Sequence, residues 1–85
     1  GLNISKTYIS TLDELKKMPL THLNISNTGI TDIDSISQLP LTHLNIHNTR
    51  VTNLSVLQNM PSLIEVKANW HQFPQDKIKL KGVAR

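Results

Sequence analysis

A run of 21 residues is repeated along most of this 85-residue chain. The segment from Leu20 to Thr28 returns from Leu41 to Thr49 with one residue changed, and Leu2 opens a shortened copy of it. A fixed period of this length is typical of stacked repeat proteins, in which each unit buries its apolar face against its neighbours. The repeat therefore predicts a stacked solenoid, an architecture that displays surface and favours a binding function.

Within each copy, the apolar residues follow two spacings. Leu23 and Ile25 are two residues apart, which places them on one face of a short strand. From Ile30 to Leu39 the spacing is three, which indicates a 3₁₀ or short helical return that the following proline ends. In register, the apolar columns are Leu20/Leu41, Leu2/Leu23/Leu44, Ile4/Ile25/Ile46, Ile9/Ile30/Val51, Leu12/Ile33/Leu54, Leu15/Ile36/Leu57 and Met18/Leu39/Met60.

This pattern resembles the leucine-rich repeat family, in its short bacterial form, over about residues 2–73. The resemblance implies an α/β fold, namely a right-handed leucine-rich repeat solenoid with a parallel β-sheet on the concave face and 3₁₀ or short helical returns on the convex face. It also implies a partner-binding role. The family often has asparagine just after the strand, where this chain has Thr7, Thr28 and Thr49. A threonine hydroxyl can hydrogen-bond the backbone of the same turn.

We expect a single domain over residues 1–85. It contains repeats over about 2–19, 20–40 and 41–61, a degenerate copy over 62–73 with one residue inserted at Ser62, and a C-terminal cap over 69–85. In the cap, residues 77–81 alternate lysine with apolar residues, which predicts a half-buried last strand protected from edge pairing. Trp70 either anchors a partner or, as we favour, seals the core. Because Gly1 begins within a repeat, we interpret the chain as part of a longer protein.

The residues beside Leu23 and Ile25 are expected to point outward and to form columns across strands about 4.8 Å apart. These columns are His22/His43/Glu65, Asn3/Asn24/Asn45/Lys67 and Ser5/Ser26/His47/Asn69. We predict that this face binds a protein or peptide partner. The predicted contact residues are His22, Asn24, Ser26, His43, Asn45, His47, Glu65 and Lys67. The alternative is a structural spacer whose polar columns merely satisfy one another.

Other classes of function find little support. The chain has no glycine-rich phosphate loop, nucleophile elbow or pair of carboxylates on a common face, so we predict no enzyme activity and no cofactor. His22 and His43 are expected to be neighbours, but no cysteine and no zinc-type spacing accompanies them, and we predict no metal site. The net charge of +3 comes mainly from residues 77–85, which lack acids and stacking aromatics. We therefore do not expect nucleic acid to bind.

Composition also bears on location and association. No apolar run is long enough to span a membrane, and no signal-like segment is present. The absence of cysteine fits a reducing compartment, so we expect an intracellular or bacterial setting. Leu2 would begin an open sheet edge, which predicts a monomer or weak edge-mediated self-association.

Overall fold

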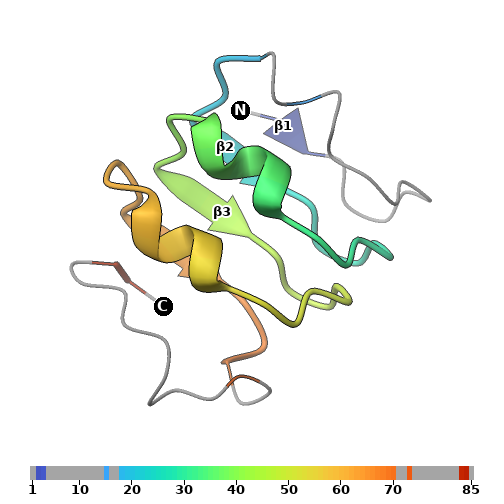
Figure 1. The fold of residues 1–85 in the computed structure, drawn as a ribbon. Coiled ribbons are helices and arrows are strands. Elements are labelled where there is room, and N and C mark those ends of the chain that lie inside the picture. The colour runs from blue at the N-terminus through green and yellow to red at the C-terminus, as the bar shows by residue number, and fades with distance from the viewer. Residues whose placement is uncertain (1, 4–14, 16–17, 71–72, 74–82, 85) are drawn as a thin grey trace.

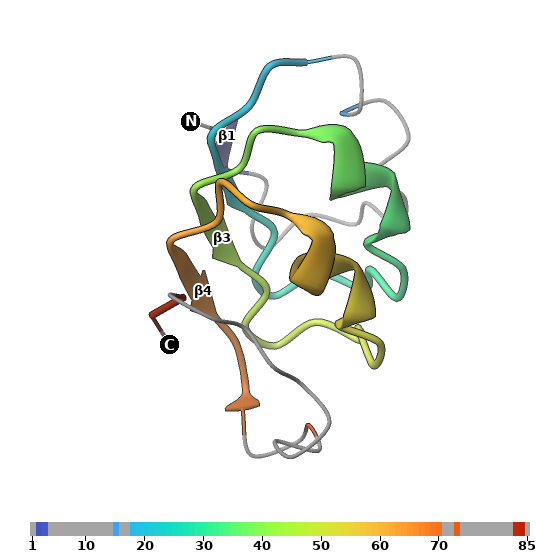
Figure 2. The same ribbon diagram turned by 60° about the vertical axis from the view of Figure 1, so that its left-hand side comes forward.

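The computed structural model describes residues 2–3, 15, 18–70, 73 and 83–84. In chain order, its elements are β1 (Leu2–Asn3), β2 (His22–Asn24), the 3₁₀ helix η2 (Asp34–Gln38), β3 (His43–Asn45), the 3₁₀ helix η3 (Ser55–Asn59) and β4 (Glu65–Lys67). Figures 1 and 2 show the strands side by side, with η2 and η3 on the other side of the molecule.

The four strands form one parallel sheet in the order β1-β2-β3-β4. Leu23 pairs with Leu44, and Leu44 pairs with Val66, so the offset between partners grows from 21 to 22 residues. The larger offset shows one extra residue between β3 and β4, the span that contains the insertion predicted at Ser62. The sheet order equals the chain order, so strands that follow one another in the sequence lie side by side.

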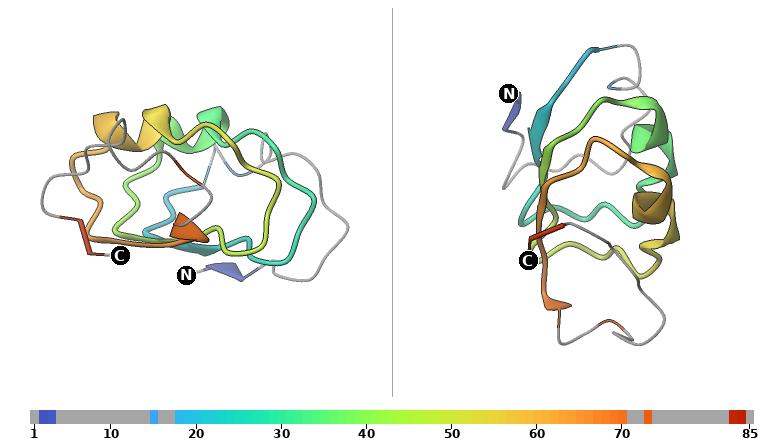
Figure 3. Two further views of the ribbon diagram at one scale, coloured as in Figure 1. Left: turned by 90° about the horizontal axis from the view of Figure 1, so that it is seen from below. Right: turned by 90° about the vertical axis from the view of Figure 1, so that its left-hand side faces the viewer.

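The second layer consists of 3₁₀ turns, with no α-helix among the described residues. Each return ends in the same backbone bond: the N–H of Leu39 donates to the Ile36 carbonyl at 3.0 Å, and that of Met60 to the Leu57 carbonyl at 3.3 Å. Both views in Figure 3 show the strands on one side of the molecule and the 3₁₀ turns on the other. This layering agrees with the predicted α/β class.

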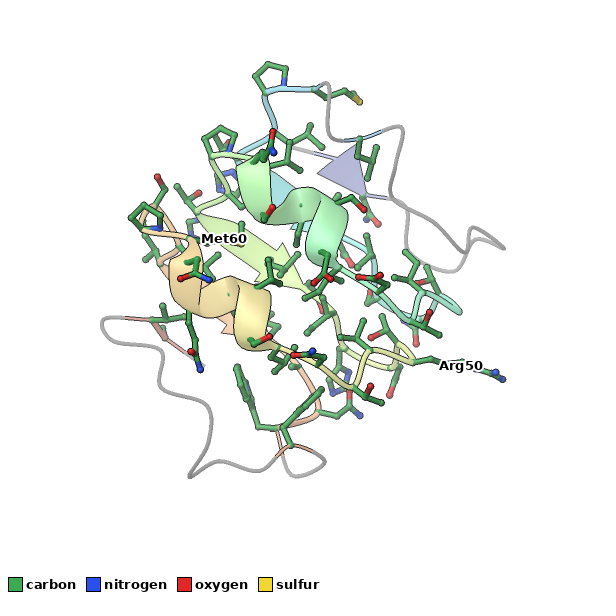
Figure 4. The ribbon with its side chains drawn as sticks, in the orientation of Figure 1. Arg50 and Met60 are labelled. Carbon is green, nitrogen blue, oxygen red and sulfur yellow. The ribbon has the colours of Figure 1, made fainter. Side chains whose placement is uncertain are left out.

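The core fills the space between the two layers. The predicted apolar columns are buried over residues 23–60 apart from the half-buried Leu20 that precedes them, and Ile25, Ile30 and Ile36 are fully inaccessible. Met60, labelled in Figure 4, is also buried, whereas Met18 in the same column is 41% exposed. The prediction that Met18 is a core residue is therefore wrong. Met18 is the first member of its column, so a neighbouring coil covers it on one side only.

Two asparagines allow the chain to turn sharply after each strand. Asn27 and Asn48 have φ angles of 58° and 57°, in the left-handed region that asparagine tolerates better than most residues. The hydroxyl of Thr28 donates to the Ile25 carbonyl at 2.7 Å, and that of Thr49 to the Ile46 carbonyl at 2.9 Å. The predicted bond from threonine to the turn backbone is confirmed at both positions, while Thr7 lies outside the described residues.

The C-terminal part closes the sheet at β4. Ala84 forms a parallel bridge with Glu65: the Val66 N–H donates to the Ala84 carbonyl at 2.9 Å, and the Ala84 N–H to the Ile64 carbonyl at 2.7 Å. The strand predicted over residues 77–81 lies outside the described residues. Trp70 is half-buried against the core and meets the ring of Phe73 edge-on at 6.2 Å, as expected of a residue that seals the core.

No helix in the described part of the chain has the length and apolar character needed to cross a membrane.

Candidate partner-binding face

The outer face of the sheet carries two hollows that are open to solvent. We call the first the sheet groove; it has a volume of about 420 Å³ and is lined by Asn3, His22, Leu23, Asn24, His43, Leu44, Asn45, Glu65 and Lys67. We call the second the strand-end hollow; it has a volume of about 440 Å³ and is lined by Ser26, Asn27, Asn45, His47, Lys67, Ala68 and Trp70. Asn45 and Lys67 line both, so the two hollows are neighbours.

The predicted contact residues divide between these hollows. Six of the eight line the sheet groove, namely His22, Asn24, His43, Asn45, Glu65 and Lys67. The other two, Ser26 and His47, line the strand-end hollow. The strand register brings them together, because His22 pairs with His43 and His43 pairs with Glu65, as the first predicted column requires.

The two histidines of this column are held in a fixed arrangement. The rings of His22 and His43 are stacked, with centroids 4.3 Å apart and planes 8° from parallel. Each ring Nδ1 lies within hydrogen-bonding distance of the preceding threonine hydroxyl, at 3.0 Å for Thr21 and 2.9 Å for Thr42. The Thr42 hydroxyl also donates to the Thr21 carbonyl at 3.1 Å. Both hydroxyls therefore contact the histidine rings, and the tautomer of each ring sets which group of the pair donates.

The side chains of Asn24 and Asn45 form hydrogen bonds within their own turns. Asn24 Oδ1 accepts hydrogen bonds from the Ser26 N–H at 3.0 Å and from the Ser26 hydroxyl at 2.6 Å. Asn45 Oδ1 accepts from the His47 N–H at 3.0 Å. Both side chains are half-buried, so these turn contacts hold the two amides in place on the sheet face.

Ser26 lies at the predicted face but is largely covered. It lines the strand-end hollow, and its hydroxyl donates to Asn24 Oδ1, yet the residue is only 7% exposed. Little of its surface is therefore open to solvent. In the next coil the same position is His47, which is exposed.

A ladder of amides borders the strand-end hollow and was missed by the sequence reasoning. Asn48 Nδ2 donates to Asn27 Oδ1, and Asn69 Nδ2 donates to Asn48 Oδ1, both at 3.1 Å. The Asn48 N–H also donates to Asn69 Oδ1 at 2.7 Å. Asn69, assigned from the sequence to the column of Ser26 and His47, thus joins the neighbouring column instead. The recurrence of asparagine at positions 27 and 48 was the available signal.

Charge is sparse on this face. Lys67 is exposed and Glu65 is half-buried, while Arg50 extends away from the body of the molecule in Figure 4. Within the described part of the chain, no group of three or more histidine, cysteine, aspartate or glutamate side chains is placed to hold a metal ion. The stacked histidine rings lie face to face, which suits packing rather than joint ligation of one ion.

Comparison with known proteins adds no family assignment. No family model matches the sequence, and a search of curated proteins finds no match to it. The function is therefore argued from the geometry of the described residues.

Proposed function

We propose that this chain is a protein–protein interaction module that binds a protein or peptide partner through the outer face of its sheet. The observation that carries the proposal is the convergence of six polar side chains from three strands on one groove. These groups are half-buried or exposed, and they offer hydrogen bonds in fixed positions. Ordered polar groups around an accessible surface favour recognition because little side-chain entropy is lost on binding.

We also propose that the coils form a right-handed solenoid of the leucine-rich repeat type. Its support is the recurrence of equivalent bonds at a spacing of 21 residues, such as Thr42 N–H to the Thr21 carbonyl at 2.7 Å and Asn48 to Asn27. In such an array, the sheet is the concave face and the 3₁₀ turns are the convex face. The partner would then lie on the concave side.

A second candidate function is a structural spacer with no binding of its own. It is favoured by the number of polar groups on this face that already have partners, including the stacked His22 and His43 and the Oδ1 atoms of Asn24 and Asn45. In this alternative the polar columns stabilise the coils, and neither hollow holds a ligand.

The test is a selection of displayed random 12-residue peptides on the immobilised chain, followed by affinity measurements on the synthetic peptides recovered. The outer-face variant combines His47→Ala with Lys67→Ala, because His47 supports the turn through its backbone N–H and Lys67 is exposed. The control variant combines Gln38→Ala with Asn59→Ala, two exposed residues of the 3₁₀ layer.

We expect the outer-face variant to bind the recovered peptides about ten-fold more weakly or worse, as loss of central interface contacts does. The control variant should bind as the parent chain does. Equal binding by all three proteins, or recovery of no peptide, would contradict the proposal and favour the spacer.

A further inference from the structure

The asparagines of the sheet face present one defined chemical group outward. A backbone N–H can only donate, so the atoms that face the N–H groups of Ser26 and His47 must be the Oδ1 atoms of Asn24 and Asn45. The Nδ2 group, which can only donate, is the other end of each amide. Among the described residues, none accepts a hydrogen bond from either Nδ2 group, so both are available to another molecule.

The turns themselves do not require this amide group. On the 3₁₀ layer, Asn53 Oδ1 accepts from the Ser55 N–H at 2.9 Å, in the same local arrangement. One coil earlier, Asp32 fills that position and accepts from the Asp34 N–H at 2.8 Å. A carboxylate therefore serves such a turn as well as an amide does. The Nδ2 donors of Asn24 and Asn45 are thus additional to what the turns need.

The strand-end hollow places one of these two asparagines, Asn45, beside a cation. Asn45 and Lys67 both line it, His47 lies at the same site, and no carboxylate lines it. Glu65 lines the sheet groove but not this hollow. Ala68 and Trp70 add an apolar wall. A cation with a neighbouring amide donor is complementary to a carboxylate, whose oxygens only accept and bind charged donors most strongly.

We propose that the strand-end hollow binds a carboxylate of an acidic peptide segment of the partner, with Lys67 and the Nδ2 group of Asn45 as donors. The inference rests on the proposed function and names the chemistry of its partner. Beyond this carboxylate, the segment continues along the sheet groove, where the Nδ2 group of Asn24 meets a further acceptor.

The first test uses the peptides recovered by the selection described above. Each is resynthesised with its aspartate and glutamate side chains replaced by asparagine and glutamine, and both forms are titrated by fluorescence anisotropy. We expect the recovered peptides to be rich in acids. Their amide forms should bind about ten-fold more weakly or worse, because a charged hydrogen bond is replaced by a neutral one.

The second test changes one atom group of the protein. Asn45→Asp keeps Oδ1 for the His47 N–H but replaces the outward Nδ2 donor with a carboxylate oxygen, which should weaken binding about ten-fold or more. Asn53→Asp is the matched control: it makes the same change, in the same kind of turn, on the 3₁₀ layer. It should leave the affinity unchanged, and thermal melts should show both variants folded.

The outcomes separate the two proposals. The recovered peptides could bind the outer-face variant more weakly than the parent chain, yet keep their affinity when their aspartates and glutamates are replaced by asparagine and glutamine. That result would overturn the carboxylate site and leave the proposed function standing. Equal affinity of Asn45→Asp and Asn53→Asp would overturn it too. A selection that returns no peptide would overturn both proposals.

Discussion

At the scale of single residues, side chains of threonine and asparagine shape the turns. Thr28 is buried and bonds the Ile25 carbonyl, whereas the equivalent Thr49 is half-buried. Asn27 and Asn48 accept the left-handed backbone and link one turn to the next. Since each of these residues has a counterpart 21 positions away, the same substitution can be compared in two environments.

Thr28→Val should lower the free energy of unfolding by about 1–3 kcal/mol, because it leaves the Ile25 carbonyl without its buried donor. Thr49→Val, at the more accessible turn, should cost less. Thr52→Val at an exposed position should change stability by about 0.5 kcal/mol at most. Urea melts of the three variants would check this order, and equal losses in all three would contradict it.

Asn48→Ala and Asn48→Gly separate two roles of one side chain. Both remove the side-chain bonds to Asn27 and Asn69 and keep the backbone bond to Asn69, but glycine tolerates the φ angle of 57° and alanine does not. We expect the alanine variant to be less stable than the glycine variant by about 1–2 kcal/mol. Thermal melts would show the difference, and an alanine variant as stable as the glycine variant would refute the strain argument.

At the scale of elements, each strand has a role fixed by its place in the sheet. β3 lies between β2 and β4, and its Leu44 is almost fully buried. Leu44→Ala should therefore cost about 2–5 kcal/mol, as removal of a core leucine does when the surroundings cannot collapse. Ile64→Ala just before β4 is the comparison, because Ile64 is 53% exposed and should cost far less. An unchanged melt for Leu44→Ala would contradict the observed register.

The sequence predicts those parts of the fold that follow from a repeated spacing. Apolar residues recur at regular intervals in the strands, as at Leu23 and Leu44, and in the 3₁₀ returns. The repeat period therefore predicts both the element in which these residues lie and their burial. The low exposure of Ser26 could not be predicted in this way, because its hydroxyl forms a side-chain bond to Asn24 that the period does not reveal. Six of the nine residues that line the sheet groove could be listed in advance as contact residues, whereas the direction in which each amide points required atomic positions.

At the scale of the whole molecule, Ala84, near the C-terminus, pairs with β4 at one edge of the sheet. The backbone of Ala84 forms hydrogen bonds with Ile64 and Val66, the two residues beside Glu65. These bonds occupy the outer edge of β4. A parallel edge that is already bonded is a poor template for pairing with another chain. The weak self-association expected from the sequence therefore stays a prediction for the opposite edge, at β1.

Ala84→Pro should loosen this closure, because proline has no N–H to donate to the Ile64 carbonyl. We expect a loss of about 1–2 kcal/mol and more self-association, measured by thermal melts and sedimentation velocity. Ala84→Ser keeps the N–H and should behave as the parent chain does. If the proline variant remained as stable and as monomeric as the serine variant, the bridge would have no such role.

The constant offset between β2 and β3 would let the chain accept a further copy of its repeat. Segments 20–40 and 41–61 meet through paired strands and an amide bond, all at an offset of 21 residues. A copy of this segment inserted between them could form the same contacts on both sides. Under the proposed function, each added strand would extend the binding face by about 4.8 Å, and the number of copies would set the length of partner segment that the face contacts.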